Sequence, residues 1–231
     1  MIYHRPSHQR GSANFGWLDS KHSFSFGNYY DPDHMGISAL RVINDDTVTP
    51  GAGFAEHGHR DMEIISYVLD GAIEHRDTEG NQFVVKAGEV QKMSAGSGIA
   101  HSEYNHSKDD MLRFLQIWII PNVTGINPEY EQREIAQNGQ LTPLASPDGI
   151  AGSLTIHQDA TMYRVSLAAA EMLELDSTIR PGYLHVIDGT VSTKDIIAGD
   201  GDGIAVYEES LTLTAGEDGL TALWFDLPTH P

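Results

Sequence analysis

Short apolar segments with period-two alternation recur along the whole chain, and turn sequences separate them. In a strand, successive side chains point to opposite faces, so this alternation predicts β-strands. Turn pairs lie between the segments, as at Asp70-Gly71 and Gly80-Asn81. We expect strands at residues 37–43, 63–69, 82–85, 112–120, 154–157, 183–187, 203–207 and 220–225.

Long amphipathic helices are not predicted, and only residues 129–136 favour a short helix. Many short strands with regular turns are typical of a β-sandwich or a β-barrel. The chain has 231 residues, 23 of them glycine, and is long enough for two small β-domains with cores of their own. We therefore expect an all-β fold of two jelly-roll-like barrels or sandwiches with few short helices.

A short internal repeat supports two related halves. Residues 68–73, Val-Leu-Asp-Gly-Ala-Ile, reappear as Val-Ile-Asp-Gly-Thr-Val at residues 186–191. Each copy predicts a strand, a glycine turn and the start of a return strand. The stretch 121–147 carries proline and glycine and is the expected boundary, which divides the chain into domains of residues 1–132 and 133–231.

The charge of the chain limits its partners. There are 14 Lys and Arg against 33 Asp and Glu, a formal net charge of −19. Such a charge repels phosphate backbones, so direct nucleic-acid binding is not expected. Neither a signal peptide nor an apolar stretch of about 20 residues that could span a membrane is visible. We expect a cytoplasmic protein, and the absence of cysteine excludes disulfides and thiolate metal ligands.

Two pairs of metal-type side chains are the strongest chemical signal in the sequence. His57 and His59 form the first pair, and His101 and Glu103 form the second. Residues two apart on a strand point to the same face. Two neighbouring strands would therefore direct three imidazoles and one carboxylate toward one point. Nitrogen and oxygen ligands of this kind suit a catalytic divalent metal.

Glu63 is a second candidate for the carboxylate ligand, because it follows His59 closely in the sequence. Glu103 shares its strand and face with His101, whereas Glu63 would have to reach the metal across a turn. We prefer Glu103 and expect Glu63 to orient an imidazole ligand, with a solvated strand carboxylate as the alternative.

The remaining histidines and aromatic residues are expected to have structural roles. The second half of the chain lacks a matching ligand pair, so we expect its isolated histidines, His157 and His185, to be hydrogen-bonded structural residues. Surface or structural positions are also expected for His22, His34, His75 and His106. Asn105 is expected to cap a turn near the site. Core packing is expected for Trp17, Phe24, Phe26, Tyr29 and Tyr30.

The surroundings of the ligand pairs resemble the two-part cupin signature. The first part fits except that Gly71 falls one residue late, and the second part has Ser94 where proline is usual and two extra residues between Gly96 and His101. Longer segments resemble the pirin family of cupins, and among pirins the chain is most similar to the bacterial pirin-like quercetin 2,3-dioxygenases. The segments that carry this resemblance are residues 16–32, 40–46, 57–63, 69–71 and 93–103.

The resemblance to pirins implies a bicupin in which only the N-terminal cupin binds a metal. The positions of the pirin ligands fall on His57, His59, His101 and Glu103 of this sequence, and all four residue types are present. One divalent transition metal is implied. The resemblance favours Fe(II), and Mn, Ni, Co, Cu or Zn are alternatives that the same ligands accept.

The implied activity is cleavage of the central ring of flavonols such as quercetin with O2 and release of carbon monoxide. The flavonol 3-hydroxyl must lose its proton to bind the metal, and Glu103 is the expected general base. We expect a monomer that binds a flavonol-like substrate and O2. Two alternatives stay open: a metal-containing regulatory or redox-sensing pirin that binds a protein partner, and a non-redox cupin such as an isomerase.

Overall fold

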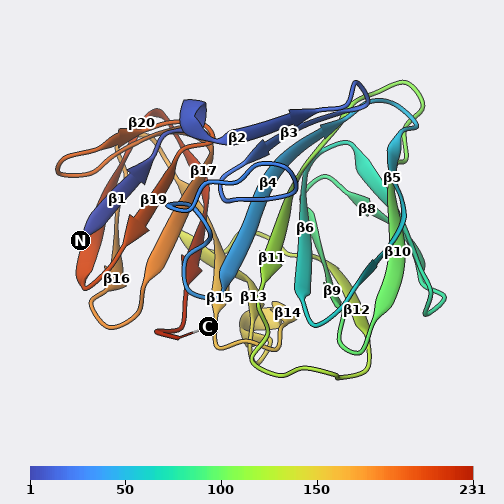
Figure 1. Ribbon diagram of the computed structural model, residues 1–231. Helices are drawn as coiled ribbons and strands as arrows, with labels where there is room; N and C mark the ends of the chain where they lie inside the picture. The colour runs from blue at the N-terminus through green and yellow to red at the C-terminus, as the bar shows by residue number, and fades with distance from the viewer. Residues whose placement is uncertain (231) are drawn as a thin grey trace.

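The computed structural model describes residues 1–230, which form β-strands in three sheets (Figure 1). The helical elements in this range are two single turns of 3-10 helix, η1 (Ser7–Gln9) and η2 (Ile150–Gly152). The prediction of an all-β chain is therefore confirmed. Within the same range, no helix has the length and apolar character needed to cross a membrane.

Two sheets that pack against each other form the first barrel. The larger has the strand order β12-β9-β6-β11-β4-β3-β2, and the smaller has the order β5-β10-β7-β8. Side chains from both sheets meet in one apolar cluster, in which Val68 and Phe114 of the larger sheet pack with Ile73 and Val85 of the smaller. The bounds are β2 (Gly11–Asn14), β3 (Leu18–His22), β4 (Leu40–Val48), β5 (Gly53–His59), β6 (Glu63–Asp70), β7 (Ala72–Asp77), β8 (Gln82–Lys86), β9 (Glu89–Ser94), β10 (Ile99–Asn105), β11 (Leu112–Ile119) and β12 (Glu129–Glu134).

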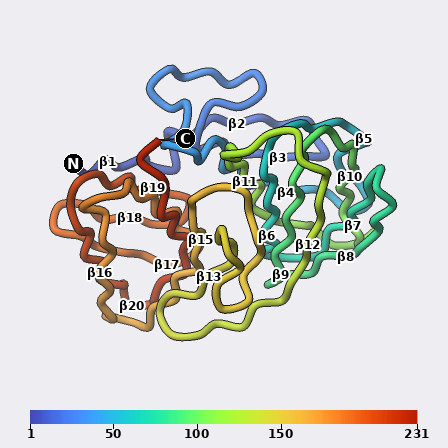
Figure 2. Tube along the Cα trace, turned by 90° about the horizontal axis from the view of Figure 1, so that it is seen from below, coloured from blue at the N-terminus to red at the C-terminus, as the bar shows by residue number. Residues whose placement is uncertain are grey.

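The second half of the chain folds into a nine-stranded sheet with the main order β1-β19-β17-β20-β15-β13-β14. Strand β1 comes from the N-terminus and pairs with β19, so the first residues of the chain lie in the second half of the molecule (Figure 2). The bounds are β1 (Ile2–Arg5), β13 (Leu141–Ser146), β14 (Leu154–Thr155), β15 (Thr161–Leu167), β16 (Met172–Ser177), β17 (Gly182–Ser192), β18 (Ile197–Ala198), β19 (Gly203–Val206) and β20 (Glu209–Asp226).

Alternation along β11 shows how one strand serves two cores. Leu115 and Ile117 point out of the first barrel and join a large apolar cluster with residues of the second half, such as Phe225. Burying each of these side chains contributes about 2 kcal/mol. Gln116 and Trp118, on the other face of the same strand, point into the first barrel and line its cavity. The packing of the two halves thereby fixes which side chains face the cavity.

Most predicted strands are confirmed, and the differences lie at their ends and in one segment. The strand expected at 37–43 begins later, as β4 (Leu40–Val48), and residue 37 makes only an isolated bridge. The short helix predicted at 129–136 is wrong, because Glu129–Glu134 is strand β12 and pairs along its whole length with β9. Glu129 accepts a hydrogen bond from the buried Lys92, and this contact between strands outweighs the local helix preference of the segment.

The two copies of the repeat differ in structure. In the first copy, Gly71 turns the chain from β6 into β7, as expected. In the second copy the chain does not turn, because β17 continues from Gly182 to Ser192 past Gly189, with irregular pairing to β20 on either side of it. The predicted return strand after Gly189 is therefore wrong. Both glycines have positive φ values, 80° and 88°, which a bulge tolerates as well as a turn.

Candidate metal centre

Antiparallel pairing of β5 with β10 brings the three histidines of the sequence analysis together. His101 lies directly opposite His57, and His59 lies opposite Ile99. The ring centroids are 4.6 Å apart for His57 and His101, 4.8 Å for His57 and His59, and 4.9 Å for His59 and His101. One nitrogen from each ring falls within 4.8 Å of the other two. The same-face rule on neighbouring strands therefore placed these three side chains correctly.

Two of the three imidazoles, those of His59 and His101, are held as neutral rings. Burial, with the neighbouring imidazoles, lowers the pKa of His59 and of His101 to about 4, so both rings keep a free lone pair at neutral pH. His57 directs Nδ1 at the Ala55 carbonyl oxygen, 2.8 Å away, which leaves Nε2 as its free nitrogen. His101 is buried, and neither of its nitrogens has a hydrogen-bond partner within residues 1–230. Such rings are suited to binding a cation.

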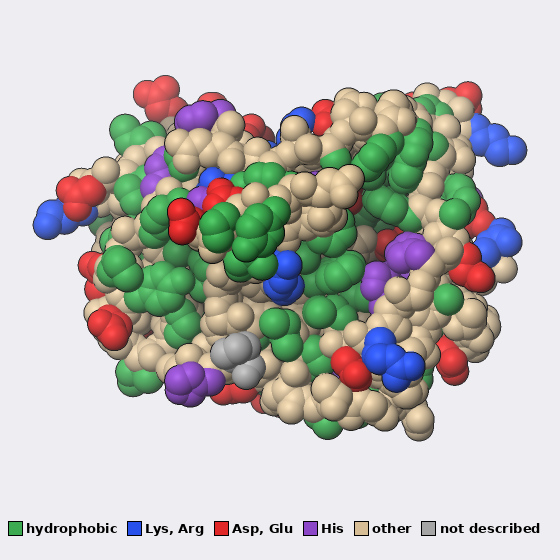
Figure 3. All heavy atoms as spheres, in the orientation of Figure 1, with side chains coloured by type: hydrophobic (Ala, Val, Ile, Leu, Met, Phe, Trp, Pro, Cys, Tyr) green, Lys and Arg blue, Asp and Glu red, His purple; other side chains and the backbone are tan. Residues whose placement is uncertain are grey.

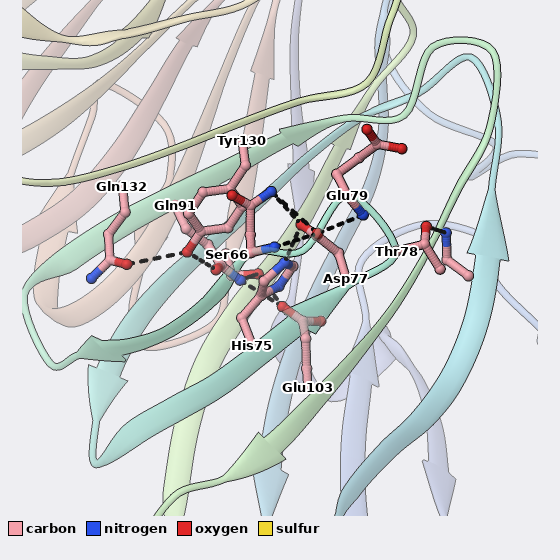
Figure 4. A network of polar contacts seen from close by, with 11 residues as sticks. Ser66, His75, Asp77, Thr78, Glu79, Gln91, Glu103, Tyr130 and Gln132 are labelled. Carbon is pink, nitrogen blue, oxygen red and sulfur yellow. Dashed lines mark hydrogen bonds and ion pairs between the residues drawn. The ribbon is translucent and has the colours of Figure 1, made fainter.

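Glu103 lies on β10, two residues beyond His101, and is buried below the histidines. Its Oε1 accepts hydrogen bonds from Ser66 Oγ at 2.9 Å and from Gln91 Nε2 at 2.6 Å (Figure 4). Its Oε2 accepts from Gln116 Nε2 at 2.8 Å. All three donors come from the facing sheet, so the carboxylate is held across the interior of the barrel.

The charge of Glu103 is stabilised within this buried position. Burial by itself raises its pKa, but the nearby imidazoles of His101 and His75 and the hydrogen bonds from Gln116 and Ser66 outweigh burial and lower it. Glu103 is therefore a carboxylate at neutral pH, able to bind a cation or to accept a proton.

His75 joins this centre, although the sequence analysis predicted a surface or structural position for it. It lies on β7 opposite Glu103, is fully buried, and its ring centroid is 5.3 Å from that of His101. With His101 and Glu103 it forms a second group of metal-type ligand atoms within 4.8 Å. Its Nε2 lies 3.0 Å from Asp77 Oδ2 (Figure 4). The His75-Arg76-Asp77 spacing was the available signal, since it puts both side chains on one face of a strand.

Glu63 lies apart from the histidine cluster. It is buried at the start of β6, and its Oε2 accepts a hydrogen bond from Ser94 Oγ at 2.8 Å. Burial raises the pKa of Glu63, although the hydrogen bond from Ser94 and the neighbouring Lys92 and His157 oppose this increase. The alternative of a solvated carboxylate is wrong, because Glu63 is buried. Its side-chain hydrogen bond within the described residues goes to Ser94 and not to a histidine of the cluster.

A cavity of about 590 Å³ opens beside the histidines, between the two sheets of the first barrel. Aromatic rings line much of it, including Trp17, Phe54 and Trp118, and His57, His59 and Glu103 lie in its wall. In Figure 3, hydrophobic and histidine side chains gather around a hollow in this half of the molecule. The rings of His59 and Trp118 are 5.1 Å apart and meet edge to face. A flat aromatic ligand fits such a lining.

The core-packing prediction for the N-terminal aromatic residues is only partly right. Phe24 is buried in the core as expected. Trp17, Phe26 and Tyr29 line the cavity, and Tyr30 is 73% exposed. Alternation identifies the inward face of a strand, but it does not distinguish a packed interior from the wall of a cavity.

Two family models match the chain in succession. The Pirin model matches residues 3–119, and the model of the Quercetinase C-terminal cupin domain matches residues 143–227. The chain belongs to the pirin family. The resemblance inferred from the sequence is thereby confirmed, together with the bicupin fold that it implies.

Relatives similar to this pirin over its full length carry related names. It is 48% identical over 231 residues to the quercetin 2,3-dioxygenase of Escherichia coli (strain K12), and 99% of each chain is covered. The crystal structure of a bacterial pirin from Escherichia coli in complex with nickel(II) superposes with a TM-score of 0.93, at 48% identity and 99% coverage of each chain. A quercetin 2,3-dioxygenase from Acinetobacter baumannii shares the fold at a TM-score of 0.80, with 15% identity and coverage of 98% and 79%.

The donor set of this pirin fits a divalent transition metal. Three imidazoles converge, and the buried His101 offers two nitrogens that no other described group uses. Glu103 adds a carboxylate beside them, so the ligand atoms would be nitrogen and oxygen, as first-row divalent ions prefer. Both clusters of metal-type ligands found in residues 1–230 lie in the first barrel. The histidines of the second half, His157 and His185, are not among the residues of these clusters. His157 Nε2 lies 3.1 Å from Glu129 Oε2, as expected for a hydrogen-bonded residue, whereas Nδ1 of the buried His185 has no hydrogen-bond partner within residues 1–230.

His22, His106 and Asn105 lie outside the cluster of His57, His59 and His101. His22 lines the cavity, where its Nε2 lies 2.8 Å from Ser20 Oγ, and His106 is 53% exposed on its side chain. Asn105 donates from Nδ2 to the carbonyl oxygens of Val48, Thr49 and Asp110. The predicted turn-capping role of Asn105 is confirmed, because its Oδ1 also accepts from the Ser107 backbone at 3.0 Å.

Asp46 is a buried carboxyl in the cavity wall that the sequence analysis did not identify. Burial, together with the charges of Asp45, Glu103 and Asp19, raises its pKa to about 7, and a hydrogen bond from Ser20 opposes this increase. The folded-state pKa therefore lies above the ordinary value of 3.8. A group of this kind lowers stability progressively as the pH rises from about 4 to 7, since the unfolded chain ionises first.

We expect Asp46→Asn to stabilise the pirin more at pH 8 than at pH 5. At the higher pH the buried wild-type carboxyl must ionise, which is unfavourable, whereas asparagine stays neutral. The gain in free energy of unfolding from the substitution should therefore be larger at pH 8 than at pH 5 by roughly 2 kcal/mol. Urea unfolding of both proteins at each pH measures it. The exposed Asp33→Asn is the control, and it should change stability equally at both pH values. An equal effect of Asp46→Asn at both pH values contradicts the raised pKa.

Proposed function

We propose that this pirin is a metal-dependent dioxygenase that opens the central ring of flavonols such as quercetin with O2 and releases carbon monoxide. The observation that carries the proposal is the aromatic-lined cavity that opens directly beside three converging imidazoles and a buried carboxylate. The names and full-length similarity of its relatives support the same activity. The second half would complete the fold as a domain without metal, with the domains at residues 1–132 and 133–231.

The proposed metal ligands are His57, His59, His101 and Glu103. Fe(II) is our proposed ion, and nickel(II), found in the related Escherichia coli structure, is accepted by the same nitrogen and oxygen ligands. A divalent metal held there would supply the positive charge that stabilises a deprotonated 3-hydroxyl, and the redox chemistry that O2 requires.

Residues of the chain would bind the flavonol and move its proton. Glu103, a carboxylate at neutral pH, would accept the proton of the 3-hydroxyl at one of its oxygens. The buried indole Nε1 of Trp118 has no acceptor within the described residues, and its ring lies against His59. It would donate to the neighbouring carbonyl oxygen of the flavonol. The aromatic walls would hold the rings flat and exclude water from the reacting carbon atoms.

Metal reconstitution coupled to product analysis tests the proposal. Metal-free protein is loaded separately with Fe(II), Ni(II), Mn(II), Co(II), Cu(II) or Zn(II), and bound metal, quercetin loss and carbon monoxide are measured. We expect at least one redox-active metal to give quercetin loss with equimolar carbon monoxide, in air only. Turnover that persists without O2 would point to a non-redox cupin. Failure with every metal would reject the dioxygenase proposal in favour of a regulatory or redox-sensing protein.

A further inference from the structure

A row of polar side chains crosses the larger sheet of the first barrel at one level. Cross-strand pairing places Ser66 opposite Gln91, Gln116 opposite Ser66, Asn44 opposite Gln116, and His22 opposite Asn44. The row thus spans β9, β6, β11, β4 and β3 and faces the interior. Polar residues are rare in such positions unless they have hydrogen-bond partners.

The residues of this row on β9, β6 and β11 hydrogen-bond to the carboxylate of the metal centre. Ser66, Gln91 and Gln116 all donate to Glu103, and Gln91 Oε1 accepts from Tyr130 at 2.9 Å. These contacts fix the orientation of both amides. Because the Gln116 amino group donates to the carboxylate, its Oε1 is the atom left as an acceptor.

The second part of the row has buried acceptors without donors. Within residues 1–230, no hydrogen-bond partner exists for Gln116 Oε1, Asn44 Oδ1, His22 Nδ1 or Oδ1 of the adjacent Asp46. All four side chains are at least nine-tenths buried and line the cavity. We call these four residues the acceptor row. Neighbouring strands are about 4.8 Å apart, so the acceptor row extends for roughly 10 Å from β11 to β3.

The tautomer of His22 follows from its neighbours. Ser20 lies beside Asp46 and hydrogen-bonds to that carboxyl, so the Ser20 oxygen accepts from His22 Nε2, 2.8 Å away. Nδ1 of His22 is then a bare acceptor. Burial, with the charges of Lys21 and Arg10, lowers the pKa of His22, so the ring is neutral. The cavity wall therefore offers several acceptors. Its unpartnered donors in the described chain include the indole Nε1 of Trp118, the amino group of Asn44 and, while Asp46 is protonated, the hydroxyl of that carboxyl.

We propose that the acceptor row selects aromatic ligands that carry several hydroxyl groups, by accepting hydrogen bonds from hydroxyls other than the one that meets the histidine cluster. This inference rests on the proposed function, for which it defines the substrate class. A ligand without those hydroxyls would leave the buried acceptors unpaired, and such mismatches are strongly rejected.

Equilibrium binding under nitrogen tests the inference apart from turnover. The Zn(II)-loaded protein is titrated with quercetin, which has hydroxyls on both outer rings. It is also titrated with 3-hydroxyflavone, which keeps only the hydroxyl and carbonyl expected at the metal. We expect quercetin to bind at least about tenfold more tightly. Asn44→Leu and His22→Phe should each weaken quercetin about tenfold and 3-hydroxyflavone less than about threefold. Asn122→Leu, on the exposed surface, is the matched control.

The outcomes separate the inference from the proposed function. Equal affinity of the wild type for both ligands, or equal weakening of both by folded variants, overturns the acceptor row as the selecting element. If the selective loss is observed, the inference holds. If the protein loaded with a redox-active metal then binds quercetin selectively but does not consume it in air, the dioxygenase proposal is rejected. The acceptor row would still define the class of ligand. Circular dichroism of each variant checks that it is folded. If one of the two variants fails to fold, the other still tests the inference.

Discussion

Replacing His101 by alanine is expected to reduce metal affinity by at least about 100-fold, so that purified protein loses stoichiometric metal. Loss of a single outer contact to a ligand histidine already costs 10- to 100-fold in many sites, and loss of the ligand itself costs more. His101 has the largest expected effect because both of its nitrogens lack protein partners and it belongs to both ligand groups. Its removal breaks no hydrogen bond within the described chain, so the fold should persist.

Metal content after dialysis, measured by inductively coupled plasma mass spectrometry, checks this expectation. His8→Ala removes a histidine from the exposed surface and is the matched control. Thermal unfolding of metal-free wild type and variant separates loss of metal from loss of fold. Stoichiometric metal in His101→Ala would exclude His101 as a ligand and would leave His57 and His59 as the remaining histidine ligands among the predicted residues.

The histidine cluster could be predicted because its geometry is local. Two residues spaced by two on a strand share a face whatever the rest of the fold, so His57 and His59 needed only a neighbouring strand. His101 supplied it, and the pairing of β5 with β10 has these residues in register. Strands β6 and β11 could also be predicted from the sequence, since their apolar runs are long and bounded by turns.

The features of the site that could not be predicted from the sequence depend on pairing between distant segments. His75 reaches the centre because β7 pairs with the other edge of β10. The spacing of His75 and Asp77 indicates a shared face of a strand, but it does not indicate which strand lies beside it. The polar row that crosses the larger sheet likewise arises from the register of five strands, each of which contributes one ordinary polar residue. The 129–136 segment carries helix-favouring Glu and Gln residues, yet pairing with β9 and the ion pair to Lys92 made it a strand.

Glu103→Gln is expected to keep the fold and to reduce turnover of flavonol by about 100-fold or more, because an amide cannot accept the proton of the 3-hydroxyl. The hydrogen-bond network can adapt. Gln91 is fixed by Tyr130, but Gln116 Oε1 has no partner in the described structure. A flip of the Gln116 amide would present that oxygen to the new amino group. The substitution therefore leaves no buried donors facing each other.

The matched control for Glu103→Gln is Glu63→Gln, which alters a buried carboxyl held by Ser94 away from the histidines. We expect Glu63→Gln to keep metal and turnover, since glutamine still accepts from Ser94. Quercetin loss and carbon monoxide release are measured per bound metal, so that weaker metal binding is not mistaken for slower chemistry. Normal turnover by metal-loaded Glu103→Gln rejects Glu103 as the base. Loss of metal from Glu63→Gln with Glu103→Gln unaffected would instead return the ligand role to Glu63, against its position in the fold.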